Sequence, residues 1–127
     1  MSWTDKRPMS PHLQIYKLPI TAKLSILHRG TGAVLTIGLI LISIVMASAA
    51  SGISAWASMH WLLSSWFGYL VLFGFTASLY YHFCNGIRHL FWDAGKGLEL
   101  KSAEKSAIMV LIATAVLTIF TWVIALF

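Results

Sequence analysis

The sequence predicts an all-α membrane protein whose three transmembrane helices form an up-and-down bundle. Of its 127 residues, 58% are hydrophobic and only 10% are charged, whereas soluble domains carry about 25% charged residues. Residues 30–87 contain no Asp, Glu, Lys or Arg, and neither do residues 106–127. Because a bilayer core needs roughly 20 apolar residues per helix, the first stretch accommodates two crossings and the second accommodates one.

The division into elements follows from where the apolar stretches begin and end. Residues 1–22 are polar and contain all three prolines, so they predict a surface segment that precedes a transmembrane domain over residues 23–127. Within that domain the helices are expected at about 23–49, 58–91 and 104–127. A small uncharged connection, SGIS, follows the first helix, and the two glycines of DAGKG end the second.

The basic residues predict the topology. All nine Lys and Arg lie in or next to the N-terminal segment and the second connection, and basic segments stay on the cytoplasmic side. The N-terminus is therefore expected in the cytoplasm and the C-terminus on the opposite side. Since these cations flank apolar spans, the net charge of +5 indicates contact with a lipid bilayer and no nucleic-acid partner.

The first 25 residues do not have the composition of a secretory signal or of an organelle transit peptide. We therefore expect a multi-pass protein of the bacterial inner (cytoplasmic) membrane in preference to the mitochondrial inner membrane.

His82 is the first candidate for chemistry. It lies six residues from Arg88, which marks the charged boundary, and is therefore about 9 Å inside it. An ionisable group at that depth is a functional-site hypothesis. A metal or haem ligand, a proton relay and a hydrogen-bonded packing residue all fit. Gly74, Ser78 and Gly86 share its helical stripe and would permit close approach of another helix or of a flat ligand.

Four side chains are expected at one depth just outside that histidine: His28, Arg29, Arg88 and His89. Such cationic and donor groups suit the two propionates of a haem, although basic residues at this depth also bind lipid phosphates. Ser25, one turn before His28, could cap the first helix or donate a hydrogen bond to a carbonyl ligand.

If His82 binds haem, its iron needs a second axial ligand or stays five-coordinate. His60 is too distant, at about 33 Å by helical rise, and the interfacial depth of His28 makes it a poor partner. The second histidine is therefore expected on a different polypeptide.

Two segments carry a resemblance to a known family. Residues 7–12 (RPMSPH) with 25–32 (SILHRGTG), and residues 82–93 (HFCNGIRHLFWD), resemble the signature segments of the cytochrome b membrane-anchor subunit of succinate dehydrogenase (succinate–quinone oxidoreductase). The length and the three-helix pattern also agree, so the resemblance covers nearly the whole chain.

The resemblance implies roles by position. His82 matches the ligand of haem b, His28 and Arg29 match residues near the haem propionates, and Ser25 and Arg29 match residues that line the ubiquinone pocket. It also implies three partners: a second membrane anchor that supplies the other axial histidine, an iron–sulfur subunit and a flavoprotein subunit. The chain would not be catalytic alone, but would contribute to quinone reduction.

Two alternatives stay open at this stage. Relatives of this kind also serve as anchors of quinol–fumarate reductases, and the residues quoted do not determine the direction. The other alternative is a haem-free membrane subunit for assembly or transport, with His82 as a proton relay.

Overall fold

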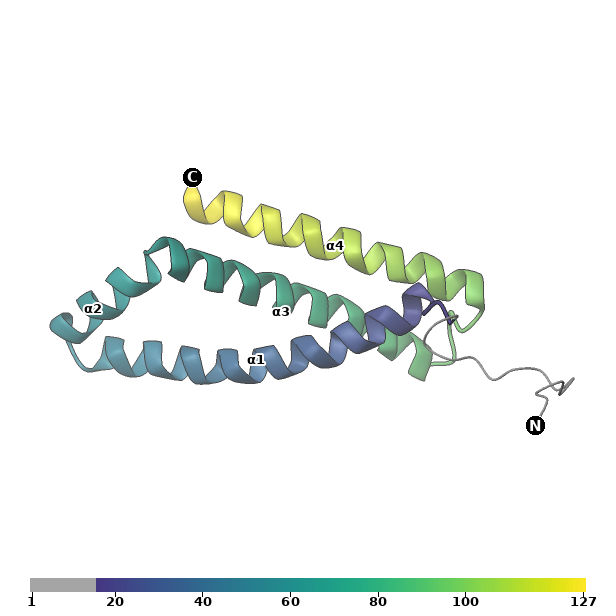
Figure 1. Ribbon diagram of the computed structural model, residues 1–127, viewed down its shortest axis with the longest axis horizontal. Helices are drawn as coiled ribbons and strands as arrows, with labels where there is room; N and C mark the ends of the chain where they lie inside the picture. Colours follow the sequence, from purple (N-terminus) through teal and green to yellow (C-terminus); the bar gives the residue numbers. More distant parts are fainter. Residues whose placement is uncertain (1–15) are drawn as a thin grey trace, which may run out of the picture.

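The computed structural model describes residues 16–127, which form four helices: α1 (Ile20–Ala50), α2 (Ile53–Leu63), α3 (Trp66–Asp93) and α4 (Leu100–Leu126) (Figure 1). Three of them, α1, α3 and α4, are long and apolar enough to cross a membrane. The predicted all-α fold with three spans is confirmed, while the orientation of the termini stays a prediction.

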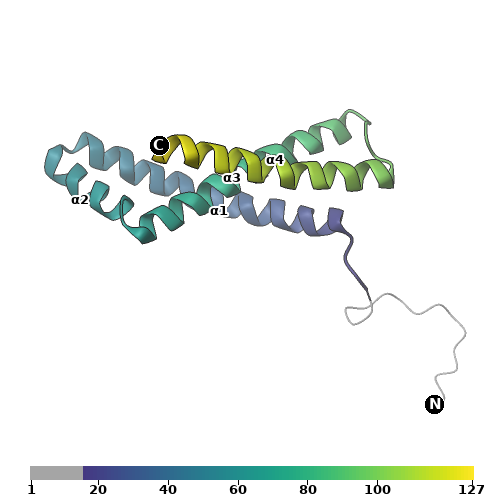
Figure 2. The same cartoon turned by 90° about the horizontal axis from the view of Figure 1, so that it is seen from above.

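α3 is the middle helix of the bundle and contacts both α1 and α4. The start of α1 lies at the same end of the bundle as the α3–α4 connection, and α2 lies at the other end with the C-terminus (Figures 1 and 2). The charged side chains of the described residues therefore gather at one end, because they occur only near the start of α1 and around that connection.

The expected helix over residues 58–91 is divided in the structure. α2 already begins at Ile53, and α3 begins at Trp66 after a break at Ser64 and Ser65. Ser65 has extended backbone angles, and its hydroxyl accepts a hydrogen bond from the Gly68 N–H at 3.1 Å. A serine can cap a new helix within an apolar run because its hydroxyl replaces a lost backbone partner.

The other helix bounds differ from the expected ones in a consistent way. α1 begins at Ile20 rather than residue 23, directly after Pro19, and α4 begins at Leu100 rather than residue 104. Charged residues mark where a helix leaves the hydrocarbon, but its backbone can continue into the headgroup region. Of the predicted surface segment, residues 1–15 lie outside the described part of the chain, and so does the RPMSPH motif.

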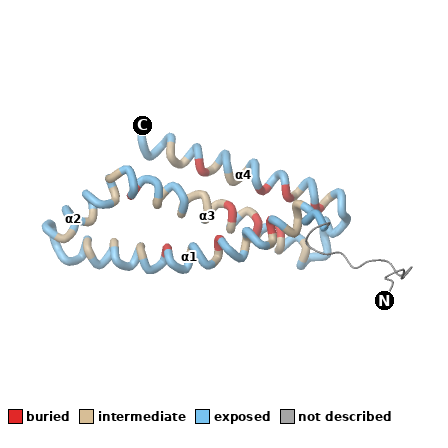
Figure 3. The backbone as a smooth tube through the Cα atoms, in the orientation of Figure 1, coloured by how far each residue is buried: buried red, intermediate tan, exposed pale blue. Residues whose placement is uncertain are grey.

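The buried side chains are concentrated in the charged half of the bundle (Figure 3). Leu24, Tyr81, Ala107 and Val110 form one cluster that joins all three spans. The Tyr81 hydroxyl donates a 2.7 Å hydrogen bond to the Leu24 carbonyl, which links α3 to the first turns of α1. Most large apolar side chains elsewhere are exposed, as expected for surfaces that face lipid or another membrane subunit.

Candidate functional site

Three imidazoles meet where α1 and α3 approach each other at the charged end. The rings of His28 from α1 and His82 from α3 are stacked, with centroids 4.0 Å apart and planes 16° apart. His89, two turns after His82, has its ring centroid 5.3 Å from that of His28. The structure therefore brings His82 together with His28 and His89, two of the side chains that the sequence placed just outside it.

The backbone of α1 orients His82. Its Nδ1 lies 3.2 Å from the His28 carbonyl oxygen and 3.3 Å from the Thr31 hydroxyl, which itself donates to the same carbonyl at 2.9 Å. Since a carbonyl oxygen only accepts, the proton of a neutral His82 belongs on Nδ1, and Nε2 carries the lone pair. Metal-binding histidines characteristically have this second hydrogen bond, because it determines the tautomer and the ring orientation.

A cavity of about 430 Å³ lies beside His82, between α1 and α3. Apart from His82 and two threonines, its lining consists of glycine and apolar side chains. Gly32 lines it, and a Cβ atom at that position would lie 3.2 Å from His82 Cε1. A side chain at position 32 would thus press on the His82 ring, and glycine leaves the ring its full space.

His28 itself has an unmet polar atom. Its Nδ1 is buried and has no hydrogen-bond partner among the described residues. The stacked rings of His28 and His82 lie face to face, so their ring nitrogens do not converge on one point between them.

Ser25 and Arg29 lie one turn apart on α1 at the same end of the bundle. Arg29 is exposed, and its Nε donates to the Ser25 carbonyl at 3.4 Å. Ser25 does not cap the helix, because α1 begins five residues earlier, at Ile20. Its hydroxyl is thus not required for the capping role that the sequence had allowed.

Arg88 does not join this histidine cluster, contrary to the expected ring of cations. Its buried guanidinium donates to the Ser106 hydroxyl at 2.8 Å and to the Ala103 carbonyl at 2.9 Å, both on α4. Its Cζ also lies 4.0 Å from the centroid of the Trp92 ring. Arg88 lies six residues after His82, which places the two side chains about 120° apart around α3. Arg88 therefore faces α4, whereas His82 faces α1.

Sequence reasoning assigned no role to Thr31 and Gly32, although both lie in the SILHRGTG segment. Their spacing from His28, three and four residues, was the available signal, because such residues share a helix face.

The two glycines of the predicted small-residue stripe on α3 face open space: a Cβ at Gly74 or Gly86 would meet nothing within 4 Å. Among the described residues, no helix packs closely against either glycine.

Fold and site together define a small integral membrane protein of three spans with an imidazole cluster near one membrane surface. Residues 4–121 match the family described as succinate dehydrogenase/fumarate reductase transmembrane subunit. The chain therefore belongs to this family, and similar proteins named cytochrome b subunits of succinate dehydrogenase identify it as a membrane anchor of that type. Such a subunit works in a complex with other succinate dehydrogenase subunits.

Similar proteins come from bacteria and from a eukaryote. The succinate dehydrogenase cytochrome b556 subunit of Paracoccus denitrificans is 42% identical, over 93% of this chain and 91% of the relative. The b556 subunit of Rickettsia felis is 39% identical, over 94% and 93%. The cytochrome b560 subunit of Reclinomonas americana is 37% identical, over 93% and 85%. The similarity thus extends over nearly the full length of each relative.

Proposed function

We propose that this chain holds haem b together with a second anchor subunit and lines the ubiquinone site of a succinate–quinone oxidoreductase in a bacterial inner membrane. Electrons from succinate would arrive through the flavoprotein and iron–sulfur subunits. The observation that carries the proposal is the His82 ring, whose Nδ1 lies 3.2 Å from the His28 carbonyl beside an apolar cavity. This arrangement leaves Nε2 available to an iron.

The residues around His82 fit a haem group, which when bound supplies reversible one-electron chemistry. His82 would provide the iron ligand, and Gly32 leaves room for its ring. The buried Nδ1 of His28, which has no hydrogen-bond partner within residues 16–127, would donate to a propionate oxygen. Arg29 follows His28 directly in α1 and is exposed, and its guanidinium would offer a positive charge to the same propionates.

Ser25 and Arg29 would bind the quinone headgroup. They lie one turn apart at the charged end, where the complex would deliver electrons. The Ser25 hydroxyl would donate to one quinone oxygen, and the Arg29 guanidinium would stabilise the negative charge that develops there during reduction. Binding at this end keeps the headgroup close to water, from which the protons for quinol formation come.

The first test concerns His82. With this chain tagged and the complex purified in mild detergent, His82→Leu should abolish or strongly alter the b-type absorption bands, because the iron loses a ligand. His60→Leu is the matched control, since His60 is exposed at the opposite end, and it should leave the bands unchanged. An unaltered spectrum in His82→Leu would contradict the assignment, and a colourless wild-type complex would favour the proton-relay hypothesis.

The second test concerns Arg29. Arg29→Leu should lower quinone reduction by roughly 10²- to 10³-fold, as expected when one donor to a developing anion is lost. Succinate oxidation by an artificial acceptor should persist, because the substitution is remote from the flavin. Lys23→Leu, an exposed cation two turns earlier, is the control. Full quinone activity in Arg29→Leu would remove Arg29 from the site.

A further inference from the structure

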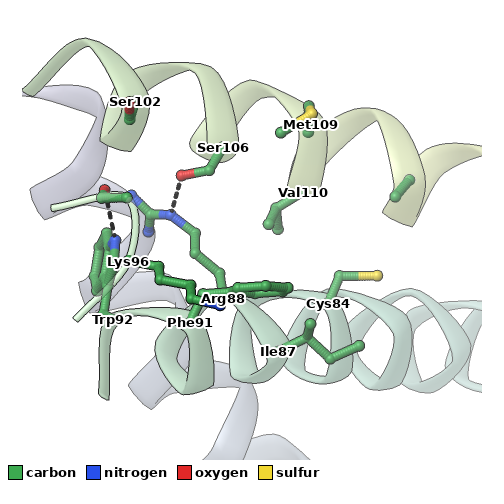
Figure 4. Close-up of a pocket in the computed structure, with 12 residues that line it drawn as sticks. Cys84, Ile87, Arg88, Phe91, Trp92, Lys96, Ser102, Ser106, Met109 and Val110 are labelled. Carbon is green, nitrogen blue, oxygen red and sulfur yellow. Dashed lines mark hydrogen bonds between the residues drawn. The ribbon is translucent and has the colours of Figure 1, made fainter. Parts of the chain in front are cut away.

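A groove between α3 and α4 has no role in the proposed function. It has a volume of about 430 Å³ and reaches from the α3–α4 connection into the membrane-spanning part (Figure 4). We call it the α3–α4 groove, and its lining includes Cys84, Ile87, Arg88, Lys96, Ser102 and Met109. The volume lies within the range of sites that bind small molecules.

The groove is polar at one end and apolar along its length. Trp92 and Lys96 lie near the α3–α4 connection, whereas Cys84, Met109 and Val110 line the part farther into the bundle. From Ser102 to Ala113 the α4 side of the groove extends about 16 Å at 1.5 Å per residue. That length is about half of the hydrocarbon core and therefore matches one leaflet.

The charge of the groove is cationic. Arg88 and Lys96 line it, and no Asp or Glu is found among the described residues of the lining. Arg88 is only 5% exposed, and its guanidinium donates to three neutral groups: the Ser106 hydroxyl, the Ala103 carbonyl and the Asn85 side-chain oxygen. Its charge is thus not compensated by those partners, and Lys96 adds a second, exposed cation at the mouth.

The groove lies on the side of α3 that faces away from the histidine cluster. At 100° per residue, Cys84, Ile87 and Phe91 lie about 140–200° around α3 from His82. A second anchor subunit that supplies the other axial ligand would cover the His82 side. That position of the second subunit, which rests on the proposed function, leaves the α3–α4 groove open to the bilayer.

We propose that the α3–α4 groove binds one anionic phospholipid. An acyl chain occupies the apolar part between Cys84 and Met109, and the phosphate lies at the mouth beside Lys96 and Ser102. The phosphate compensates the buried charge of Arg88. The acyl chain fills the apolar part of the groove, which water would not occupy favourably. A zwitterionic lipid fits the same channel but leaves the net positive charge unchanged.

The test counts lipids on the purified complex. The complex is equilibrated with equal amounts of phosphatidylglycerol and phosphatidylethanolamine of the same acyl chains, and retained lipids are measured by mass spectrometry of the intact assembly. We expect phosphatidylglycerol to be enriched in the wild type. Lys96→Gln should lower its occupancy about fivefold, the factor that one lysine contributes at an anionic surface. Lys105→Gln, exposed on α4 outside the lining, should not change it.

A second variant tests the apolar part. Ala113→Phe fills the inner end of the groove and should reduce occupancy by both lipids, whereas Ala115→Phe, exposed on α4 outside the lining, should not. Equal retention of both lipids by the wild type, or unchanged phosphatidylglycerol in Lys96→Gln, would overturn the proposal. Haem absorbance of the same samples tests the histidine site separately, because lipid counts do not depend on it.

Discussion

At the scale of single residues, His82 is oriented by the backbone of another helix. The acceptor for its Nδ1 is the carbonyl of His28, and that oxygen also accepts the Thr31 hydroxyl, so one peptide group holds both side chains. A carbonyl within a helix is normally engaged with an N–H four residues on. Thr31 lies on the same helix as this carbonyl, whereas the contact with His82 depends on the close approach of α3, which Gly32 permits.

Gly32 therefore carries a residue-scale prediction. Gly32→Val should displace the His82 ring, because even a Cβ at this position would lie 3.2 Å from Cε1, and the haem content of the complex should fall by roughly tenfold or more, as when an outer partner of a metal ligand is lost.

Gly30→Ala is the matched control for that experiment. A Cβ at Gly30 meets nothing within 4 Å, and alanine favours a helix over glycine by about 1 kcal/mol. This variant should keep the haem and unfold at a slightly higher temperature. If Gly32→Val retains full haem content while Gly30→Ala behaves as expected, close approach at Gly32 is not what positions His82.

At the scale of elements, α3 is distinguished by its composition. Its mean hydropathy over a spanning window is 1.2, against 2.5 for α1 and for α4. Polar side chains of α3 bond to both neighbours: Tyr81 donates to α1, Arg88 donates to α4, and the Tyr80 hydroxyl lies 2.7 Å from that of Thr121 on α4. In lipid such bonds hold helices together, because hydrophobic contact alone does not distinguish a helix from an acyl chain.

The break before α3 leads to a prediction at this scale. Ser65→Ala should lower the free energy of unfolding by about 1 kcal/mol, because the Gly68 N–H loses its acceptor and the Leu62 carbonyl loses a donor at 2.6 Å. Unfolding of the purified complex in increasing sodium dodecyl sulfate measures the effect. Ser58→Ala removes an exposed serine that bonds only to the preceding turn and should change stability by no more than a few tenths of a kcal/mol. Equal stability of the two variants would show that the cap does not maintain the break.

At the scale of the whole molecule, both candidate sites lie at the charged end. The imidazole cluster and Arg29 lie near it where α1 meets α3, and the mouth of the α3–α4 groove lies near it between α3 and α4. In the proposed function, soluble electron donors contact this end, and the opposite end, where α2 lies, remains free of charged groups among the described residues. The topology of the chain thus decides which compartment both candidate sites face.

The topology is itself testable. In a Cys84→Ser background, cysteine at Ser51 should react with a membrane-impermeant maleimide added to intact spheroplasts, whereas cysteine at Lys101 should react only after the membrane is opened, because basic segments stay in the cytoplasm. Both positions are exposed. The reverse labelling pattern would place the quinone residues on the outer side and contradict the proposed delivery of electrons from the cytoplasm.

Much of this protein was predictable from the chain alone, because hydropathy and charge act locally along it. The apolar stretches determined the number of spans, and the positions of Lys and Arg determined which ends lie together, since a helix must place its charged residues outside the hydrocarbon. The depth of His82 relative to Arg88 was likewise a matter of helical rise.

Only the tertiary structure decided which side chains meet, because that depends on the rotation of each helix about its axis and on where two helices cross. Arg88 and His82 lie on one helix only six residues apart, yet Arg88 turns to α4 and His82 to the His28 carbonyl on α1. The break at Ser65 also escaped prediction, since a serine in an apolar run can remain within a helix or cap a new one with the same hydroxyl. The number of spans and the charged end thus came from local chemistry, whereas the partners of His82 and Arg88 came from packing.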